Sequence, residues 1–352
     1  IQQMKNSAWV NVANIKDNTI TNYQITGLAA NTSYKFRSVA YVTDGEKTAY
    51  SSYTSALTIS TAPDQTQNFA ITGRGSNYLT LTWTKNVGAS GYIIQEQVDG
   101  VWKNVASIKG NATTSYTVAN LQPNSFHRYR MVAYKTDANG TCYGKYTGSA
   151  PGYTAPAMVS NYAVSDIGAD SLTVSWNKVE SADGYVIDIY RDGKWSQLAK
   201  ITPNDTTSYK ATGLIPGTTY KFRIKSYASN GSLLINSTYR ASVSGTTKPA
   251  AMSDVKVSAS TSTSLTVSWN KNASATGYIL QMYTDGVWKN IVKIKDINTT
   301  SYVISGLSAS TSYKVRMVAY NNSTGSTLYG KYTGAITGTT SPAAVTNLRM
   351  TN

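Results

Sequence analysis

The chain is built from short stretches in which polar and apolar residues alternate. Residues 171–176 (Ser-Leu-Thr-Val-Ser-Trp) and 220–225 (Tyr-Lys-Phe-Arg-Ile-Lys) show this most plainly. Successive side chains of a β-strand point to opposite faces, so a period of two predicts strands with one face in a core and one in solvent. We find no stretch with the 3.6-residue period of a helix. The pattern therefore predicts an all-β fold.

The strand pattern repeats along the chain with a strict period of 93 residues. All seven tryptophans fall into two series with this spacing, which are Trp83, Trp176 and Trp269, and Trp9, Trp102, Trp195 and Trp288. No insertion or deletion interrupts the register. A fixed period of this kind predicts a tandem array of one repeated unit.

Prolines with the same period mark the predicted junctions between units. They lie in Ser-, Thr- and Ala-rich stretches, at Pro63, Pro156, Pro249 and Pro342. Proline lacks the N–H of a sheet ladder and stiffens a connection. The predicted complete units are 62–154, 155–247 and 248–340. Residues 1–61 lack the first third of a unit, and 341–352 are the start of a further one, so we expect the chain to be a window on a longer protein.

Each unit contains turn signals between its predicted strands. An Asp-Gly pair between two extended stretches is typical of a two-residue hairpin, and it recurs as Asp99-Gly100, Asp192-Gly193 and Asp285-Gly286. About seven short strands fit into each unit. This number, separated by turn residues, is typical of an antiparallel β-sandwich.

Three motifs resemble fibronectin type III domains. They are the Leu-Thr-Val-Ser-Trp strand (172–176), the Gly-Leu-x-Pro-Gly-Thr-x-Tyr segment (213–220) and the Tyr-x-Phe-Arg-x-x-x-Tyr strand (220–227). Repeated at this spacing, the resemblance covers essentially the whole chain. It implies a tandem array of seven-stranded sandwiches without disulfides, with Tyr34, Tyr220 and Tyr313 as the tyrosine-corner residues. Gly-x-Trp-Lys and Tyr-Gly-Lys-Tyr segments resemble those of bacterial surface and secreted proteins.

Composition argues against an enzyme. One histidine excludes a multi-histidine metal site, and one cysteine cannot form an internal disulfide. Carboxylates are few and scattered, with no calcium-loop pattern. We therefore predict no catalytic, cofactor or metal site. The sequence contains no run of ~18 apolar residues, so no membrane span is predicted within it.

The single histidine and cysteine are interpreted as framework substitutions. His127 takes the slot of the tyrosine-corner residue, and its ring can donate one hydrogen bond to the backbone as the tyrosine hydroxyl would. Cys142 aligns with Ala49, Ile235 and Leu328, which predicts a small buried apolar side chain. A catalytic histidine and a reactive thiol are the alternatives.

The aromatic residues divide into predicted core and predicted surface. Trp83, Trp176 and Trp269 are in phase with inward Leu and Val, so we place them in the core. The series at Trp9 follows the hairpin turn and is interpreted as framework, either a lid on the core or a surface position. The better candidates for exposed aromatics are the tyrosine pairs Tyr50/Tyr53, Tyr143/Tyr146 and Tyr329/Tyr332, while the third unit keeps Tyr239 but has Asn236.

The formal net charge of +15 is partly explained by one repeated pattern. On the penultimate strand of every unit, two cations project opposite the inward aromatics. These candidate binding residues are Lys35, Arg37, Arg128, Arg130, Lys221, Arg223, Lys314 and Arg316. Such a stripe is suited to anionic cell-wall polymers or acidic glycans through screened attraction. The alternative is a solubilising face that also limits sheet-edge aggregation.

We predict a non-catalytic structural or interaction array: a stiff stalk, fibre or spacer in an extracellular or cell-surface bacterial protein. Its expected partners are neighbouring repeats and other copies of itself. The alternative is an accessory or glycan-binding region of a secreted polysaccharide-degrading enzyme or adhesin. Strand exchange between an incomplete first unit and the tail at 345–350 is a further hypothesis. Nucleic acid is not expected, because no Lys/Arg cluster or recognition helix is predicted.

Overall fold

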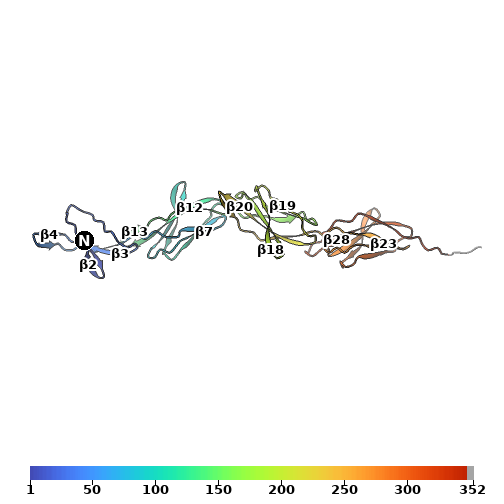
Figure 1. Ribbon diagram of the computed structural model, residues 1–352, viewed down its shortest axis with the longest axis horizontal. Coiled ribbons are helices and arrows are strands. Elements are labelled where there is room, and N and C mark those ends of the chain that lie inside the picture. The colour runs from blue at the N-terminus through green and yellow to red at the C-terminus, as the bar shows by residue number, and fades with distance from the viewer. Residues whose placement is uncertain (347–352) are drawn as a thin grey trace, which may run out of the picture. The chain divides into compact units, whose positions relative to one another are not determined.

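The computed structural model describes residues 1–346 (Figure 1). Within these residues all helical or extended secondary structure is β-strand, which confirms the all-β prediction. The chain forms two compact units, one from Ile1 to Ala157 and one from Met158 onward. Each unit is described by itself.

In the first unit, residues 70–153 form a sandwich of two antiparallel sheets. The three-stranded sheet has the order β11-β8-β7, with β7 Ala70–Arg74, β8 Tyr78–Thr82 and β11 Ser115–Ala119. The other sheet has the order β10-β9-β12-β13, and β14 also pairs with β12. Its strands are β9 Gly91–Val98, β10 Val101–Lys109, β12 Phe126–Asp137, β13 Gly140–Tyr143 and β14 Ala150–Tyr153. Because β13 and β14 pair with successive parts of β12, they are two segments of one edge strand. The sandwich therefore has the seven strands that were predicted.

The alternating pattern builds a core between the two sheets. Leu79 and Leu81 on β8 and Met131 on β12 are fully buried. Trp83 is 5% exposed and meets Tyr92 edge-on, with ring centroids 5.4 Å apart. Burying one large apolar side chain stabilises a fold by roughly 1.5–3 kcal/mol. The same pairs recur as Trp176–Tyr185 and Trp269–Tyr278.

The residues from Met158 onward hold two further sandwiches with the same strand order. One has the sheets β15-β16-β19 and β18-β17-β20-β21, with β22 on β20. Its strands are β15 Ala163–Ser165, β16 Leu172–Ser175, β17 Gly184–Arg191, β18 Lys194–Ile201, β19 Ser208–Ala211, β20 Thr219–Asn230, β21 Leu233–Asn236 and β22 Val243–Thr246. The other has β23-β24-β27 and β26-β25-β28-β29, with β30 on β28. Its strands are β23 Lys256–Ser260, β24 Ser264–Ser268, β25 Gly277–Thr284, β26 Val287–Ile294, β27 Ser301–Ser305, β28 Ser312–Asn321, β29 Leu328–Tyr329 and β30 Ile336–Thr339.

The first repeat has only the larger of the two sheets of a sandwich. It consists of β1 Gln2–Lys5, β2 Ala8–Asn11, β3 Ser33–Arg37 and β6 Leu57–Ser60 in the order β2-β1-β3-β6, with a separate hairpin of β4 Tyr41–Asp44 and β5 Lys47–Tyr50. Ile1 aligns with Ile94, so residues 1–61 contain no equivalent of β7 and β8. Residues 22–26, which align with β11, have no ladder partner there and form no strand. Leu57 is 55% exposed there, whereas its equivalent in the second repeat, Ala150, is only 8% exposed.

The predicted Asp-Gly hairpins are confirmed by their backbone geometry. Asp192 and Gly193 connect β17 to β18 with φ values of 50° and 77°, and the other two Asp-Gly pairs have similar values. Positive φ at both central residues is the type I′ turn, whose twist matches that of the strands it joins. Asp and Gly tolerate these angles better than other residues do.

The tail predicted to begin a further unit falls mostly outside the described residues. Residues 341–346 form no strand, and the remainder of the proposed strand at 345–350 is not described.

Within residues 1–346, no helix has the length and apolar character needed to cross a membrane.

Candidate functional site: a repeated arginine–aromatic clasp

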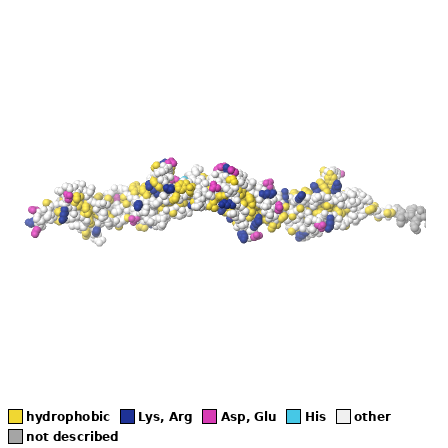
Figure 2. All heavy atoms as spheres, turned by 45° about the horizontal axis from the view of Figure 1, so that its top comes forward, with side chains coloured by type: hydrophobic (Ala, Val, Ile, Leu, Met, Phe, Trp, Pro, Cys, Tyr) yellow, Lys and Arg dark blue, Asp and Glu magenta, His cyan; other side chains and the backbone are white. Residues whose placement is uncertain are grey.

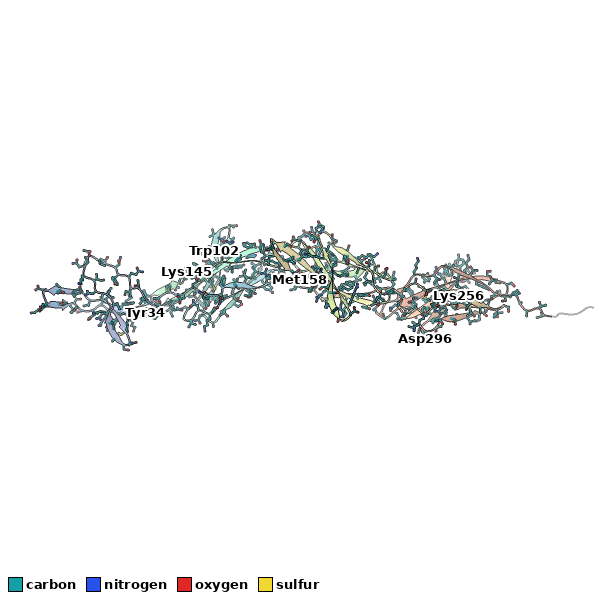
Figure 3. All side chains as sticks on the ribbon, viewed as in Figure 1. Tyr34, Trp102, Lys145, Met158, Lys256 and Asp296 are labelled. Atoms are coloured by element: carbon teal, nitrogen blue, oxygen red, sulfur yellow. The ribbon has the colours of Figure 1, made fainter. Side chains whose placement is uncertain are left out.

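An arginine lies between two aromatic rings on the outer face of the larger sheet. In the second repeat the Cζ atom of Arg130 on β12 is 4.3 Å from the ring centroid of Trp102 and 3.9 Å from that of Tyr146. Trp102, labelled in Figure 3, is on β10, and Tyr146 follows β13. Arg130 Nε donates to Gln95 Oε1 on β9 at 2.8 Å. We call such a group of four side chains a clasp, because it connects all four strand positions of the sheet.

The strand register explains why the clasp forms. Tyr129 and Met131 on either side of Arg130 point into the core and are fully buried, so Arg130 must point outward. Across the sheet, Arg130 is the ladder partner of Gln95. The Thr147 N–H donates to Met131 O at 2.9 Å, which holds the chain after β13 beside β12.

The first and fourth repeats build the same clasp. Arg37 is 4.3 Å from the Trp9 centroid and 3.8 Å from the Tyr53 centroid, and its Nε donates to Gln2 Oε1 at 2.8 Å. Arg316 is 4.3 Å from both the Trp288 and the Tyr332 centroid, and its Nε donates to Gln281 Oε1 at 2.8 Å. In all three repeats the glutamine amide also donates to an asparagine on the neighbouring strand, namely Asn11, Asn104 and Asn290.

The third repeat replaces the glutamine with a carboxylate. Arg223 lies 4.5 Å from the Trp195 centroid and 4.0 Å from the Tyr239 centroid. Its Nε and Nη2 both donate to Asp188 Oδ2 at 2.9 Å, and the Tyr239 hydroxyl donates to the same oxygen at 2.7 Å. Burial, followed by the hydrogen bond to Asp188 and the charge of that carboxylate, raises the pKa of Tyr239 to about 12.

The structure separates the eight predicted stripe residues into two classes. Arg37, Arg130, Arg223 and Arg316 are half-buried members of clasps. The exposed members are Lys35, Arg128, Lys221 and Lys314. Figure 2 shows Lys and Arg side chains spread over the visible face among white and hydrophobic atoms, rather than gathered in one block. The two outward cations of each repeat therefore have different surroundings, because two rings and a hydrogen-bond acceptor contact the arginine of each clasp.

The tryptophans occupy two different environments. Trp83, Trp176 and Trp269 are 3–5% exposed, which confirms them as core residues. The series at Trp9, whose position the sequence left open, is half-buried and covers the clasp arginines. Sequence reasoning did not find the clasp. The signal was present, because a tryptophan, an arginine and a tyrosine recur together at the 93-residue period in all four repeats.

The tyrosines predicted to be exposed are exposed. Tyr50, Tyr143 and Tyr329 are 43–66% accessible, and their pair members Tyr53, Tyr146 and Tyr332 are 37–44% accessible while contacting the clasp arginines.

The tyrosine corners implied by the fibronectin type III resemblance are present in three repeats. The hydroxyls of Tyr34, Tyr220 and Tyr313 each accept a hydrogen bond from the backbone N–H five residues earlier, at 2.8–2.9 Å.

His127 differs from this pattern. Its Nδ1 lies 2.5 Å from Glu96 Oε1, and its Nε2 lies 2.7 Å from Ser125 Oγ. The backbone bond expected of His127 is wrong, because the two ring nitrogens contact side chains and Ser125 Oγ instead donates to Gln122 O at 2.5 Å. Glu96 was the feature of the sequence that could have indicated this pairing, since the sister repeats have the uncharged residues Gln3, Ile189 and Met282 at its position.

Cys142 is half-buried rather than buried. Its Sγ lies 3.5 Å from Lys135 O and 3.8 Å from Ser60 O, so it lies where the second repeat meets the first. The prediction that Cys142 is a buried apolar side chain is therefore wrong in its burial, because the side chain is half-buried and its Sγ contacts two backbone carbonyls.

Acidic residues form no metal-binding cluster in the part of the chain that the structure describes. The two carboxylates that lie close together in the third repeat serve other contacts. Asp188 is in the clasp, and Asp183 Oδ2 accepts from the Ser229 N–H at 2.7 Å.

Comparison with known proteins agrees with this architecture. The family model described as "Fibronectin type III domain" matches residues 155–240 and 249–331. Receptor-type tyrosine-protein phosphatase eta of Gallus gallus is 26% identical over 339 residues, covering 94% of this chain and 22% of that protein. Exoglucanase B of Cellulomonas fimi is 26% identical over 287 residues, covering 74% and 25%. Chitinase A1 of Niallia circulans is 30% identical over 169 residues, covering 46% and 23%.

The chain thus spans only about a fifth to a quarter of the length of these relatives. Two matched segments, the sheet orders of the sandwiches and the three tyrosine corners agree with one another. Residues 155–240 and 249–331 are fibronectin type III domains, and the fold of the chain is a tandem array of fibronectin type III β-sandwiches.

Proposed function

We propose that the chain is a non-catalytic structural array, a stiff spacer or stalk in an extracellular or cell-surface protein of bacterial origin. The observation that carries this proposal is the repetition of one clasped sheet in every repeat. The clasp connects four strand positions across the outer face with two ring contacts and at least one hydrogen bond. Such cross-strand contacts resist separation of the strands, which suits a module that transmits force or keeps distance.

The connections between repeats support stiffness. In the first unit β6 ends at Ser60 and β7 begins at Ala70, with Pro63 between them. Side chains also bridge this junction, since Asn31 Nδ2 donates to Asn86 Oδ1 at 3.2 Å.

In the second unit β22 ends at Thr246 and β23 begins at Lys256. There the Gly217 N–H donates to Lys248 O at 3.1 Å, and Asn321 Nδ2 donates to Gly217 O at 3.3 Å. Short connections that are also hydrogen-bonded leave a junction little freedom.

Small-angle X-ray scattering tests the spacer function. The longest strand of a repeat, β12, has 12 residues and so spans roughly 40 Å. If the array is a stiff spacer, its three complete repeats alone span roughly 120 Å, which gives a radius of gyration of at least roughly 35 Å, against roughly 20 Å for a compact domain of this length. We expect a value above about 30 Å, and a value near 20 Å overturns the proposal.

A linker variant tests stiffness separately. Ten glycine and serine residues inserted after Lys248 replace a hydrogen-bonded junction with a flexible one. We expect the insertion to broaden the distribution of interatomic distances. If the wild-type chain already gives the broad distribution, it is flexible and the stalk function is wrong.

Self-association is the finer part of this proposal, because a fibre requires copies of the chain to bind one another. Light scattering coupled to size exclusion gives the mass, and a chain that acts only as a spacer stays at 37.9 kDa at all concentrations. A mass that rises with concentration supports a fibre.

A second candidate is an accessory or glycan-binding region of a secreted polysaccharide-degrading enzyme or adhesin. The relatives named exoglucanase and chitinase favour it, as do the exposed tyrosines. The partner we propose is an anionic cell-wall polymer or glycan, bound along the predicted stripe. Binding to an array of glycans tests this, with glutamine substitutions at the exposed cations Lys35, Arg128, Lys221 and Lys314. Binding that survives all four substitutions contradicts a role for these exposed cations.

A further inference from the structure

The clasp arginines of the first, second and fourth repeats keep part of their hydrogen-bonding capacity unused. Trp and Tyr ring centroids lie 3.8–4.3 Å from the Cζ atom of each guanidinium, and Nε donates to a neutral glutamine. Within residues 1–346, the Nη1 and Nη2 atoms of Arg37, Arg130 and Arg316 have no hydrogen-bond or ion-pair partner. The open side of each guanidinium is therefore its in-plane edge, which carries N–H donors and a full positive charge.

In the third repeat a carboxylate occupies part of this set of donors. Asp188 accepts from both Nε and Nη2 of Arg223, and it neutralises the guanidinium charge. Two further cations on β20, Lys221 and Lys225, point to the same face as Arg223, and Lys225 Nζ is 4.9 Å from the Tyr239 centroid. When the charge of Asp188 is counted, the three cations on this face of β20 leave the same net charge as Arg128 and Arg130 on β12.

Planar carboxylates are the ligands that fit such an edge. A ligand that approaches in the plane of the guanidinium meets two parallel N–H donors, which match the two oxygens of a carboxylate. An exposed cation two residues earlier on the same strand face adds a second attraction, as Arg128 does beside Arg130.

An exposed aromatic ring lies further along the same face. Tyr143 packs against Tyr134 with ring centroids 6.2 Å apart, and Tyr134 is four residues from Arg130 on β12, roughly 13 Å along the strand. Amphipathic rings of this kind present an apolar face and a polar tip to a ligand. In the third repeat the equivalent of Tyr143 is Asn236, so that repeat lacks both features.

We propose that the Nη edges of Arg37, Arg130 and Arg316 are binding sites for the carboxylates of an acidic, uronate-type polysaccharide, and that Arg223 is not. Three repeats have a neutral glutamine beside the arginine, and one has a carboxylate there. Binding should therefore depend on what contacts the guanidinium and not on the total charge of a repeat. This inference rests on the glycan-binding candidate function and is independent of the spacer function.

Two charge-matched triple variants of the full chain test the proposal. In the first, Gln2→Asp, Gln95→Asp and Gln281→Asp place a carboxylate beside each of the three arginines, as Asp188 lies beside Arg223, and are designed to keep the ring contacts. In the second, Lys16→Gln, Lys109→Gln and Lys295→Gln change three exposed lysines outside the clasps. Each variant lowers the formal net charge by three.

Binding is measured by isothermal titration calorimetry with polygalacturonate, dextran sulfate and neutral dextran at 0.15 M salt. We expect the wild type to bind polygalacturonate, the aspartate variant to lose at least tenfold in affinity, and the lysine variant to lose less than threefold. Asp188→Gln, which opens the fourth edge, is expected to retain or increase affinity.

Three results overturn the proposal. Equal losses in the two triple variants mean that only net charge matters. Equal affinity for dextran sulfate removes the preference for carboxylates. A wild type that does not bind polygalacturonate removes this ligand, while binding of another glycan would keep the broader candidate function. Small-angle X-ray scattering of the same variants separates the carboxylate-binding proposal and the glycan-binding candidate function from the spacer function. These substitutions should leave the radius of gyration unchanged.

Discussion

Replacing Arg130 by alanine removes the centre of one clasp and tests whether the clasp stabilises the sheet. The side chain has ring contacts at 4.3 and 3.9 Å and one hydrogen bond at 2.8 Å. A cation–π contact at a partly exposed site contributes about 0.5–1 kcal/mol, and a hydrogen bond contributes about 1 kcal/mol net. We therefore expect the free energy of unfolding of the second repeat to fall by about 2 kcal/mol.

Hydrogen exchange followed by mass spectrometry measures this change within one repeat of an array. For amides of β9 and β12 that exchange only when the sandwich opens, about 2 kcal/mol corresponds to roughly 30-fold faster exchange. The equivalent strands β20 and β28 should be unchanged, because each sandwich has its own core.

Arg128→Ala is the matched control for this substitution. Arg128 is exposed, and its nearest ring, that of Phe126, lies 5.8 Å away. Exposed substitutions of this kind change stability by less than about 0.5 kcal/mol. The reasoning is refuted if exchange in the Arg130 variant stays within threefold of wild type, or if the Arg128 variant accelerates equally.

Three further substitutions test other parts of the fold. Because the folded-state pKa of Tyr239 is raised to about 12, the stability that its neutral form provides is complete below pH 10 and is lost as the pH rises through 12. The absorbance difference at 295 nm between wild type and Tyr239→Phe should titrate near 12, and a midpoint near 10 contradicts the half-buried, hydrogen-bonded geometry of this tyrosine. His127→Phe leaves the half-buried Glu96 carboxylate without its partner and should destabilise the second repeat by about 1–3 kcal/mol. Adding Glu96→Met to this variant should restore part of the lost stability. If the effects of the two substitutions on the free energy of unfolding are simply additive, the pairing of His127 with Glu96 is disproved. Trp176→Ala should lower the free energy of unfolding of the third repeat by about 3–5 kcal/mol. Trp195→Ala, on the outer face, should lower it clearly less. Equal urea midpoints for these two variants contradict the core assignment of Trp176.

Much of the fold could be predicted from the sequence, because its determinants are local and periodic. The period of two fixes which side chains of a strand enter the core, so the burial of Trp83 and Leu79 followed from the pattern alone. The Asp-Gly turns were predictable because few residue pairs adopt two successive positive φ angles.

The candidate site could be predicted only in part. Alternation correctly put Arg130 on the outer face, but it could not show what shares that face. Trp102 and Tyr146 are 28 and 16 residues away in sequence; Trp102 lies on β10, and Tyr146 lies in the segment that follows β13. They meet Arg130 only because the strand order places β10, β9, β12 and β13 side by side.

By itself, the sequence determined that this protein is a tandem array of similar β-sandwiches, with one set of tryptophans in the cores and pairs of cations facing outward. The tertiary structure decided which of those cations are free. Two aromatic rings contact one arginine per repeat, and only Arg223 has a carboxylate, Asp188, bound to its Nε and Nη2. It likewise decided that His127 pairs with Glu96 rather than the backbone. The physical reason is the same in each case, since local periodicity sets the direction of a side chain but the pairing of distant strands sets its neighbours.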